Sequence, residues 1–296
     1  DGESSVVDDM ISIFQEFDMT ATIPVNPGHT FDGNENEWRG RWQEWRDAGQ
    51  SGFEISNHAM NHVSLLGLSD DVLEFEINGS YDRIQEHIGR EPYSFVFPFN
   101  QYDEQAIHKA LERHRALRYP ARLRKLWERT FVPIYGGEQL SLDAVRKQID
   151  FAIRERFWII PVCHGVTSEK IVKSYKPLAR DLLIGVLQYL KKNSDNVWGD
   201  TFENIHRYLS TRNRTEIIVG KQDEKEIQLV LQGKVEPGDP TALTVVIPLT
   251  SKVQSVVAQV AESRQDVDVM VEEDEMWVNV PIGVGIVEIK WELIKE

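Results

Sequence analysis

Cysteine is almost absent from this sequence. The 296 residues contain one cysteine, Cys163, which excludes an internal disulfide framework and leaves the redox compartment undetermined. Long hydrophobic runs are also absent: no stretch of about 18 consecutive apolar residues occurs, so the sequence predicts no membrane span. We recognise no signal peptide in it either.

Positive charge is scarce as well. The 33 Lys and Arg residues against 48 Asp and Glu give a net charge of −15 at pH 7. This charge disfavours nucleic acid or an anionic membrane as the general partner, because both would be repelled at long range. An apolar content of 41% with 27% charged residues is typical of a globular protein. The length allows one large domain and a small second one.

Two histidines lie four positions apart in the stretch 52–62, which reads G-F-E-I-S-N-H-A-M-N-H. Its first residues alternate like a strand, and Ser56-Asn57 suits the cap of a following helix. On such a helix His58 and His62 would share one face, with Cβ atoms about 5–6 Å apart, close enough for both imidazoles to bind one cation. The spacing alone also arises by accident, so its place at the end of a strand carries the prediction.

The same stretch resembles the second motif of the polysaccharide deacetylases, the nodulation-protein-B homology domain of carbohydrate esterase family 4. The family motif reads like G-H-E-I-G-N-H-T-x-x-H, and both of its histidines bind the catalytic metal. The resemblance therefore implies that His58 and His62 hold a divalent metal ion, with Zn²⁺ as the leading candidate.

The first two residues, Asp1-Gly2, resemble the end of the family's first motif, T-F-D-D-G, after which a helix begins. A helical pattern does follow from Val6. The resemblance implies that Asp1 is the third metal ligand, whereas a terminal acid without a role is the alternative. The family's catalytic base would precede Asp1, so we expect either an upstream segment or a molecule without its first strand and base.

Two further strand ends carry candidate residues. The run F-V-F-P-F-N-Q-Y-D at 95–103 resembles the third family motif, F-x-Y-P-x-G-x-Y-D, with Asn100 in place of the glycine. This implies that the backbone N–H of Phe99 helps to hold the oxyanion; a purely structural strand end is the alternative. The apolar run 157–163 predicts a parallel strand covered on both faces. His164-Gly165 follows it and resembles the fifth motif, which implies that His164 is the general acid; a structural histidine is the alternative.

Other residues give weaker signals. Arg122 and Arg129, in a basic stretch, are candidates for the arginine of the fourth motif. Trp38, Trp42 and Trp45 share one face of a predicted helix, which indicates packing or, alternatively, a sugar-stacking platform. His114 is interpreted as an ordinary residue of a helix over 103–115.

Strands and helices alternate over residues 1–213, which predicts an irregular (β/α) barrel of the polysaccharide deacetylase type without its first strand. We expect in it a helix that Ser141 caps and that reaches about Phe157, and a short strand at 196–198. Residues 214–296 contain no histidine. Short alternating runs between charged or Gly/Pro turns predict strands there at 217–219, 227–231, 243–247, 267–271, 277–280 and 284–289. We expect a small antiparallel β-sandwich there.

The predicted function is metal-dependent hydrolysis of N- or O-acetyl groups on a polysaccharide or oligosaccharide. The alternative is a non-catalytic glycan-binding or scaffold protein that keeps the barrel without the base. The resemblance implies an acetylated carbohydrate as partner and an extracytoplasmic location. The sequence does not determine the glycan, the choice between amide and ester, or the oligomeric state.

Overall fold

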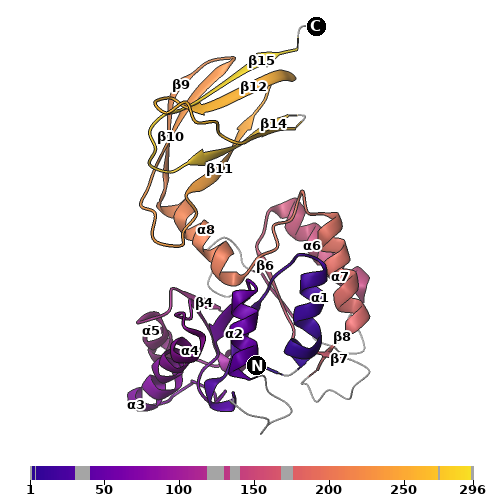
Figure 1. Cartoon of the computed structure of the whole chain (residues 1–296), viewed down its shortest axis with the longest axis vertical. Coiled ribbons are helices and arrows are strands. Elements are labelled where there is room, and N and C mark those ends of the chain that lie inside the picture. Colours follow the sequence, from indigo (N-terminus) through magenta and orange to yellow (C-terminus); the bar gives the residue numbers. More distant parts are fainter. Residues whose placement is uncertain are drawn as a thin grey trace. The chain divides into compact units, whose positions relative to one another are not determined.

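The computed structural model describes residues 2–3, 5–30, 41–118, 130–133, 141–167, 176–272 and 274–294. The chain divides into two compact units, residues 1–203 and residues 204–296, and each is described by itself (Figure 1). The predicted boundary at residue 213 falls within α8 (Phe202–Arg214). Among the described residues, no helix combines the length and apolarity that crossing a bilayer requires.

A four-stranded parallel sheet forms one half of the first unit, with its strands in chain order β1-β2-β3-β4. The strands are β1 (Thr22–Val25), β2 (Glu54–Asn57), β3 (Ser94–Val96) and β4 (Ala116–Arg118). Helices lie between them in the sequence: α2 (Trp42–Gln50), then α3 (Asp70–Leu73), η3 (Glu74–Gly79) and α4 (Ser80–Ile88), then α5 (Glu104–Leu111). The predicted α/β alternation is confirmed, and all four strands end at the same edge of the sheet.

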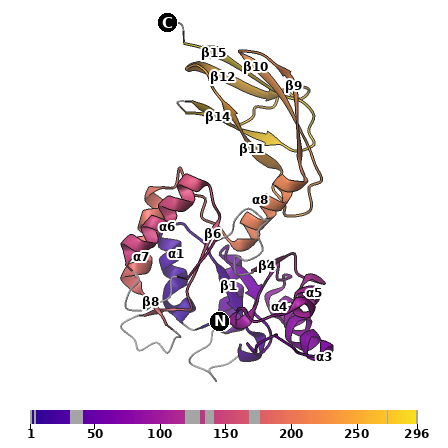
Figure 2. The ribbon, with the colours of Figure 1, turned by 180° about the vertical axis from the view of Figure 1, so that it is seen from behind.

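The rest of the first unit continues the alternation. Strand β5 (Thr130–Pro133) pairs in parallel with β6 (Ile159–Val162), and α6 (Leu142–Glu155) lies between them in sequence. Strands β7 (Val166–Thr167) and β8 (Leu178–Ala179) form another parallel pair before α7 (Arg180–Lys192). Near the N-terminus, η1 (Val6–Met10) and α1 (Ile11–Glu16) form the predicted first helix. Figure 2 shows the same elements from behind. Within the described ranges the parallel strands lie in three separate sheets, so barrel closure stays a prediction.

The tryptophan face of α2 is a packing face. Trp42 and Trp45 are 1% and 0% exposed and belong to a core cluster with residues of β1 and β2, including Val25 and Ile55. The ring of His87 stacks on Trp42 at a centroid distance of 4.3 Å. These two indoles are therefore not available to stack on a sugar, while Trp38 lies outside the described residues.

Several local predictions are wrong. No helix follows Ser56-Asn57, since the next one, α3, begins only at Asp70. The predicted strand at 196–198 is irregular, and β4 was not predicted at all. The side chains of β6 are half-buried or exposed, although its apolar sequence predicted cover on both faces.

Glu54 is the first residue of β2 and is buried, although alternation with apolar residues would place its side chain in solvent. Its carboxylate accepts hydrogen bonds from Thr22 Oγ1 and from the backbone N–H of Glu203, each at 2.8 Å. Burial raises the pKa of Glu54 above its ordinary value. Hydrogen-bond donors from β1 and from the first turn of α8 thus make this buried position tolerable.

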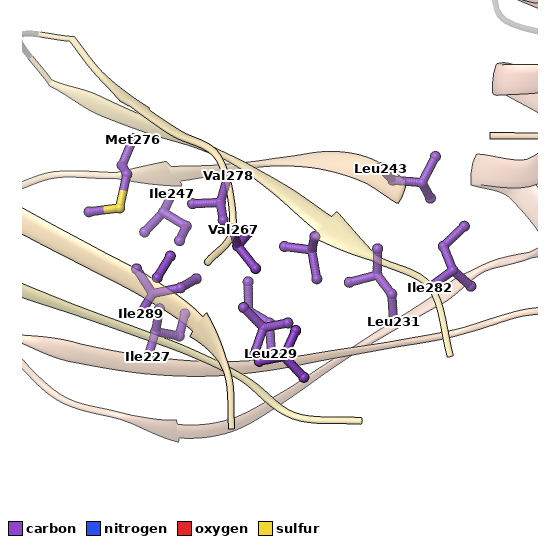
Figure 3. Close-up of a cluster of buried hydrophobic side chains, with 14 residues drawn as sticks. Ile227, Leu229, Leu231, Leu243, Ile247, Val267, Met276, Val278, Ile282 and Ile289 are labelled. Atoms are coloured by element: carbon purple, nitrogen blue, oxygen red, sulfur yellow. The ribbon is translucent and has the colours of Figure 1, made fainter. Parts of the chain in front are cut away.

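The second unit contains two antiparallel sheets. One has the order β12-β15-β10-β9, with β9 (Glu216–Gln222), β10 (Glu226–Gln232), β12 (Val253–Val260) and β15 (Val287–Leu293). The other has the order β11-β14-β13, with β11 (Ala242–Pro248), β13 (Val269–Val271) and β14 (Glu275–Pro281). Side chains from both sheets, such as Leu229 and Val278, form one buried cluster (Figure 3). Every predicted strand region coincides at least partly with an observed strand, whereas β12 was missed.

Asp239 fixes the loop 233–240 to α8 in this unit. Its carboxylate is only 5% exposed and accepts hydrogen bonds from Arg214 Nη2 at 2.6 Å and from the backbone N–H of Glu236 at 3.0 Å. Arg207 Nη1 lies 3.4 Å from the same carboxylate and donates to the carbonyl of Pro237 at 3.1 Å. This buried charge is therefore fully compensated.

Candidate metal centre

His58 lies directly after β2, at the carboxyl edge of the parallel sheet. Both neighbouring strands hold it: its backbone N–H donates to Val25 O at 3.0 Å, and its Nδ1 lies 2.6 Å from Val96 O. A carbonyl oxygen only accepts hydrogen bonds, so Nδ1 carries the hydrogen and Nε2 keeps its lone pair. Burial lowers the pKa of His58 well below its ordinary value. The ring is therefore a neutral imidazole with a nitrogen suited to a cation.

His62 reaches His58 through backbone kinks instead of a helix. Ala59 and His62 have φ angles of 64° and 53°, in the left-handed region that side chains disfavour. The two imidazole centroids are nevertheless 4.8 Å apart, with the ring planes at 73°. The structure thus brings the predicted pair together, but the helical geometry from which its proximity was argued is wrong.

Hydrogen bonds from the β1 side hold the backbone of this loop. The side-chain Nδ2 of Asn26 donates to the carbonyls of His58 and Ala59, the latter at 3.1 Å. The backbone N–H of Gly28 donates to Met60 O at 2.9 Å. Because the loop is bound to the sheet, its two left-handed residues are held in place.

The opposite side of the loop is held by Glu76, a buried carboxylate on η3. Its two oxygens accept hydrogen bonds from the backbone N–H of Asn61 at 2.9 Å and from the Asn61 side chain at 2.7 Å. The backbone N–H of Met60 donates to the carbonyl of Glu76 at 2.9 Å. The segment between the two histidines therefore has contacts on both sides.

Phe99 lies beside the histidine pair. Its ring is 60% exposed and meets the His62 ring edge-on, with centroids 4.6 Å apart. It belongs to η4 (Pro98–Asn100), where Phe99 and Asn100 have φ angles of 55° and 54°. Asn tolerates this left-handed conformation better than most residues, which explains how Asn100 stands where the resemblance has glycine.

Arg118, at the end of β4, is a site residue that the sequence reasoning missed. Its Nη2 donates to Asn100 Oδ1 at 3.1 Å. Burial is the largest cause that lowers the pKa of His58 and of His164, and the positive charge of Arg118 lowers both values further. The apolar pair Ala116-Leu117 before it is a weak sign of a strand that ends at Arg118. The many arginines around this pair made the strand hard to recognise in the sequence. The predicted candidates Arg122 and Arg129 lie outside the described residues.

His164 follows β6 and is partly buried. Burial lowers its pKa, the charges of His62 and Arg118 act in the same direction, and the buried carboxylate of Glu3 opposes them. These electrostatic interactions associate His164 with the histidine pair. Burial raises the pKa of the preceding thiol, Cys163, to about 12, so this cysteine stays protonated near neutral pH.

The matching family model is described as polysaccharide deacetylase and covers residues 1–116. This segment of the chain is therefore similar to the polysaccharide deacetylase family. The segment ends within β4 and contains Asp1, His58, His62 and Phe99, whereas His164 lies beyond it. No curated protein shows significant similarity to the chain.

Solved structures of two deacetylases and of one pseudoenzyme resemble parts of the chain at low identity. A CE4 family pseudoenzyme from Bacillus anthracis has 12% identity and a TM-score of 0.45, with 66% of this chain and 58% of that chain covered. The deacetylase PplD of Streptococcus pyogenes has 21% identity and a TM-score of 0.36, covering 38% and 49%. The Bc1960 peptidoglycan N-acetylglucosamine deacetylase has 12% identity and a TM-score of 0.46, covering 66% and 79%. The chain thus spans about half to three fifths of the first two.

The residues of the segment that matches this family model fit a divalent cation in part. Two imidazoles are side by side. Because His58 Nδ1 donates to Val96 O, Nε2 is the nitrogen of that ring whose lone pair could bind a cation. Over the described ranges, no group of three or more His, Cys, Asp or Glu side chains is placed to hold a metal ion. Asp1, the predicted third ligand, lies outside those ranges.

Proposed function

We propose that the protein removes acetyl groups from a carbohydrate by metal-dependent hydrolysis. The observation that carries this proposal is the imidazole pair at the carboxyl edge of the sheet, with centroids 4.8 Å apart, in a segment similar to the polysaccharide deacetylase family. Ligand sites of α/β proteins occur at this edge. The substrate is an acetylated polysaccharide or oligosaccharide, joined through an amide or an ester.

His58 and His62 would bind the metal ion together with Asp1. A divalent ion in a site with open positions supplies Lewis-acid activation of water and of the acetyl carbonyl. Zn²⁺ suits two nitrogen ligands and one carboxylate. The low pKa of His58 supports this assignment, because a ligand imidazole must be deprotonated at the coordinating nitrogen.

Two residues are assigned to proton transfer and charge stabilisation. The backbone N–H of Phe99 donates a hydrogen bond to the oxyanion that develops on the acetyl carbonyl. His164 donates a proton to the nitrogen or oxygen of the leaving sugar. Burial makes protonated His164 a stronger acid than a free imidazolium, which favours this donation. Arg118 is a further candidate to stabilise negative charge, because it bonds Asn100 next to Phe99.

The proposal includes a finer description of the fold. Residues 1–213 would form the irregular (β/α) barrel that carries the reaction, and residues 214–296 a β-sandwich. The common core of the two antiparallel sheets supports the second assignment. An extracytoplasmic location follows from the family and stays a prediction.

Zinc content and acetate release test the proposal directly. The chain is loaded with Zn²⁺, and acetate is measured after incubation with a panel of N- and O-acetylated oligosaccharides. His58→Ala and His62→Ala should lose both bound zinc and acetate release, whereas His164→Ala should keep zinc and lose acetate release. His108→Ala is the control, because His108 is an exposed residue of α5.

The results of these measurements lead to different conclusions. Zinc binding that survives both substitutions at the pair would refute the metal centre. Zinc binding without acetate release on any substrate, combined with glycan affinity, would replace hydrolysis by carbohydrate binding. Loss of activity in His108→Ala as well would show that histidine replacement harms the fold generally, and the affected variants would then be compared by thermal unfolding.

A further inference from the structure

His114 is a buried titratable residue that the proposed chemistry does not use. It lies between α5 and β4 and is 2% exposed. Sequence reasoning took it for an ordinary residue of the helix, but α5 ends at Leu111. Its ring packs edge-on against Tyr81 and Phe95, with centroid distances of 5.1 Å and 5.2 Å.

Both ring nitrogens of His114 make defined hydrogen bonds. Nδ1 lies 2.9 Å from Ala110 O and therefore carries the hydrogen, since a carbonyl only accepts. Nε2 lies 3.1 Å from the side-chain Nδ2 of Asn57, which only donates. Burial lowers the pKa of His114 to about 4, so near neutral pH the ring is neutral and Nε2 is an acceptor.

The carboxamide of Asn57 is fixed in one orientation by its partners. Nδ2 faces two acceptors, His114 Nε2 and Ile77 O, the latter at 3.0 Å. Oδ1 faces one fixed donor, the backbone N–H of Ala59 at 3.0 Å, and also lies 2.8 Å from the hydroxyl of Ser80, which has the carbonyls of Glu76 and Ile77 within reach as well. A flipped amide would oppose the Ala59 N–H to its NH₂ group and two acceptors, His114 Nε2 and Ile77 O, to its oxygen, so this orientation is preferred.

Asn57 acts on the backbone that carries the histidine pair. Its bond to the Ala59 N–H closes an Asx turn around His58, and Ala59 has the left-handed φ of 64°. This turn directs the chain away from the sheet and toward His62. A non-glycine residue keeps such a conformation only when its surroundings hold it.

We infer that His114 is a positioning residue for the metal centre: its Nε2 locks the Asn57 amide, and the amide sets the turn from which His58 and His62 project. This inference rests on the proposed function, because only the proposed metal binding gives the turn a role in holding ligands. If His114 only filled space, the structure would require the volume of its ring but not the acceptor at its Nε2.

Matched variants separate these two roles. His114→Phe keeps an aromatic ring of similar size and removes the acceptor, whereas His114→Gln offers a side-chain oxygen. His87→Phe is the control, because His87 stacks on Trp42 in another cluster. The affinity for Zn²⁺ is measured by chelator competition for each folded variant, together with its melting temperature.

The dissociation constant for Zn²⁺ should rise about tenfold in His114→Phe, the size expected of supporting contacts around metal ligands. It should stay near the wild-type value in His87→Phe and recover in His114→Gln. An unchanged zinc affinity in His114→Phe overturns the inference. If that variant fails to fold, Asn57→Ala is measured in its place with the same expectation, and unchanged affinity there overturns the inference equally.

Crystal structures keep this test distinct from the test of the proposed function. If the wild-type chain binds no zinc, the metal centre fails, but the structure of His114→Phe still reports on the turn. A displaced segment 57–62 supports the positioning role. A segment that keeps the bond from the Ala59 N–H to Asn57 Oδ1 and the positive φ at Ala59 overturns it.

Discussion

Gly28 provides a sharp test of how the histidine loop is held. Its backbone N–H donates to Met60 O at 2.9 Å, and a Cβ built on Gly28 would lie 2.7 Å from that same oxygen and closer still to Asn61 Oδ1. The residue does not have a positive φ, so glycine is required here for close approach and not for backbone freedom. Gly28→Ala therefore tests the close contact between Gly28 and the histidine loop.

The size of the effect follows from the contact. Ordinary contact begins near 3.4 Å, so the Met60 carbonyl must retreat by about 0.7 Å or the segment Pro27–His29 must shift by as much. Overpacking of this kind costs about 1–3 kcal/mol of unfolding free energy. The retreat also moves the segment between His58 and His62, and we expect a loss of zinc affinity of about 10- to 100-fold.

The assay compares Gly28→Ala with Gly199→Ala. A Cβ at Gly199 meets no atom within 4 Å, and the residue has no positive φ, so the same chemical change should be silent there. Thermal unfolding gives the stability, and chelator competition gives the zinc affinity. Equal melting temperatures and equal zinc affinities for the two variants would refute the reasoning about the loop.

Three other predictions concern single residues. Asp239→Asn should lower the unfolding free energy of the second unit by about 3 kcal/mol, because Arg207 and Arg214 lose a buried partner; chemical denaturation measures it. His114 has a folded pKa of about 4, below the unfolded value of 6.5, so its contribution to stability is full above pH 6.5 and is lost as the pH falls to about 4. The loss is about 3 kcal/mol, and His114→Gln should flatten this pH dependence. Asn100→Gly should be tolerated at φ 54°, whereas Asn100→Val should cost about 1–2 kcal/mol in thermal unfolding.

Each of these has an outcome that contradicts it. For Asp239, a stability equal to wild type would mean that the two arginines find water or other partners at no cost. For His114, the same pH dependence in wild type and His114→Gln would assign the acid sensitivity to other groups. For Asn100, equal stability of the glycine and valine variants would mean that the loop changes its conformation on substitution.

The predictions made from the sequence succeeded where the signal was local. The predicted cap located α6: Ser141 is its N-cap and accepts a hydrogen bond from the Ala144 N–H at 3.2 Å. The spacing of Trp42 and Trp45 indicated burial on one helix face, which the core confirms. The strand ends before His58, Phe99 and His164 were also found, because a short apolar run that stops at polar residues depends on few neighbours.

The misses have a common physical cause, which is that tertiary contacts overrode local preference. The segment 58–62 is not helical because Asn26, Asn57 and Glu76 bind its backbone groups from other elements. Arg118 was hidden in a basic stretch because only pairing with β3 makes Ala116–Arg118 a strand. Exposed β12 residues such as Val257 weakened the alternation that would have revealed that strand.

By itself the sequence determined the α/β order of the first unit and the β-rich second unit, and it selected the two imidazoles as the candidate metal ligands, because period, turn residues and side-chain chemistry are properties of short segments. Only the tertiary structure decided the tautomer of His58, the left-handed turn that joins it to His62, and the part of His114 in that turn. Those features depend on hydrogen bonds between residues far apart in the chain, such as Asn57 and His114, and no local pattern records such partners.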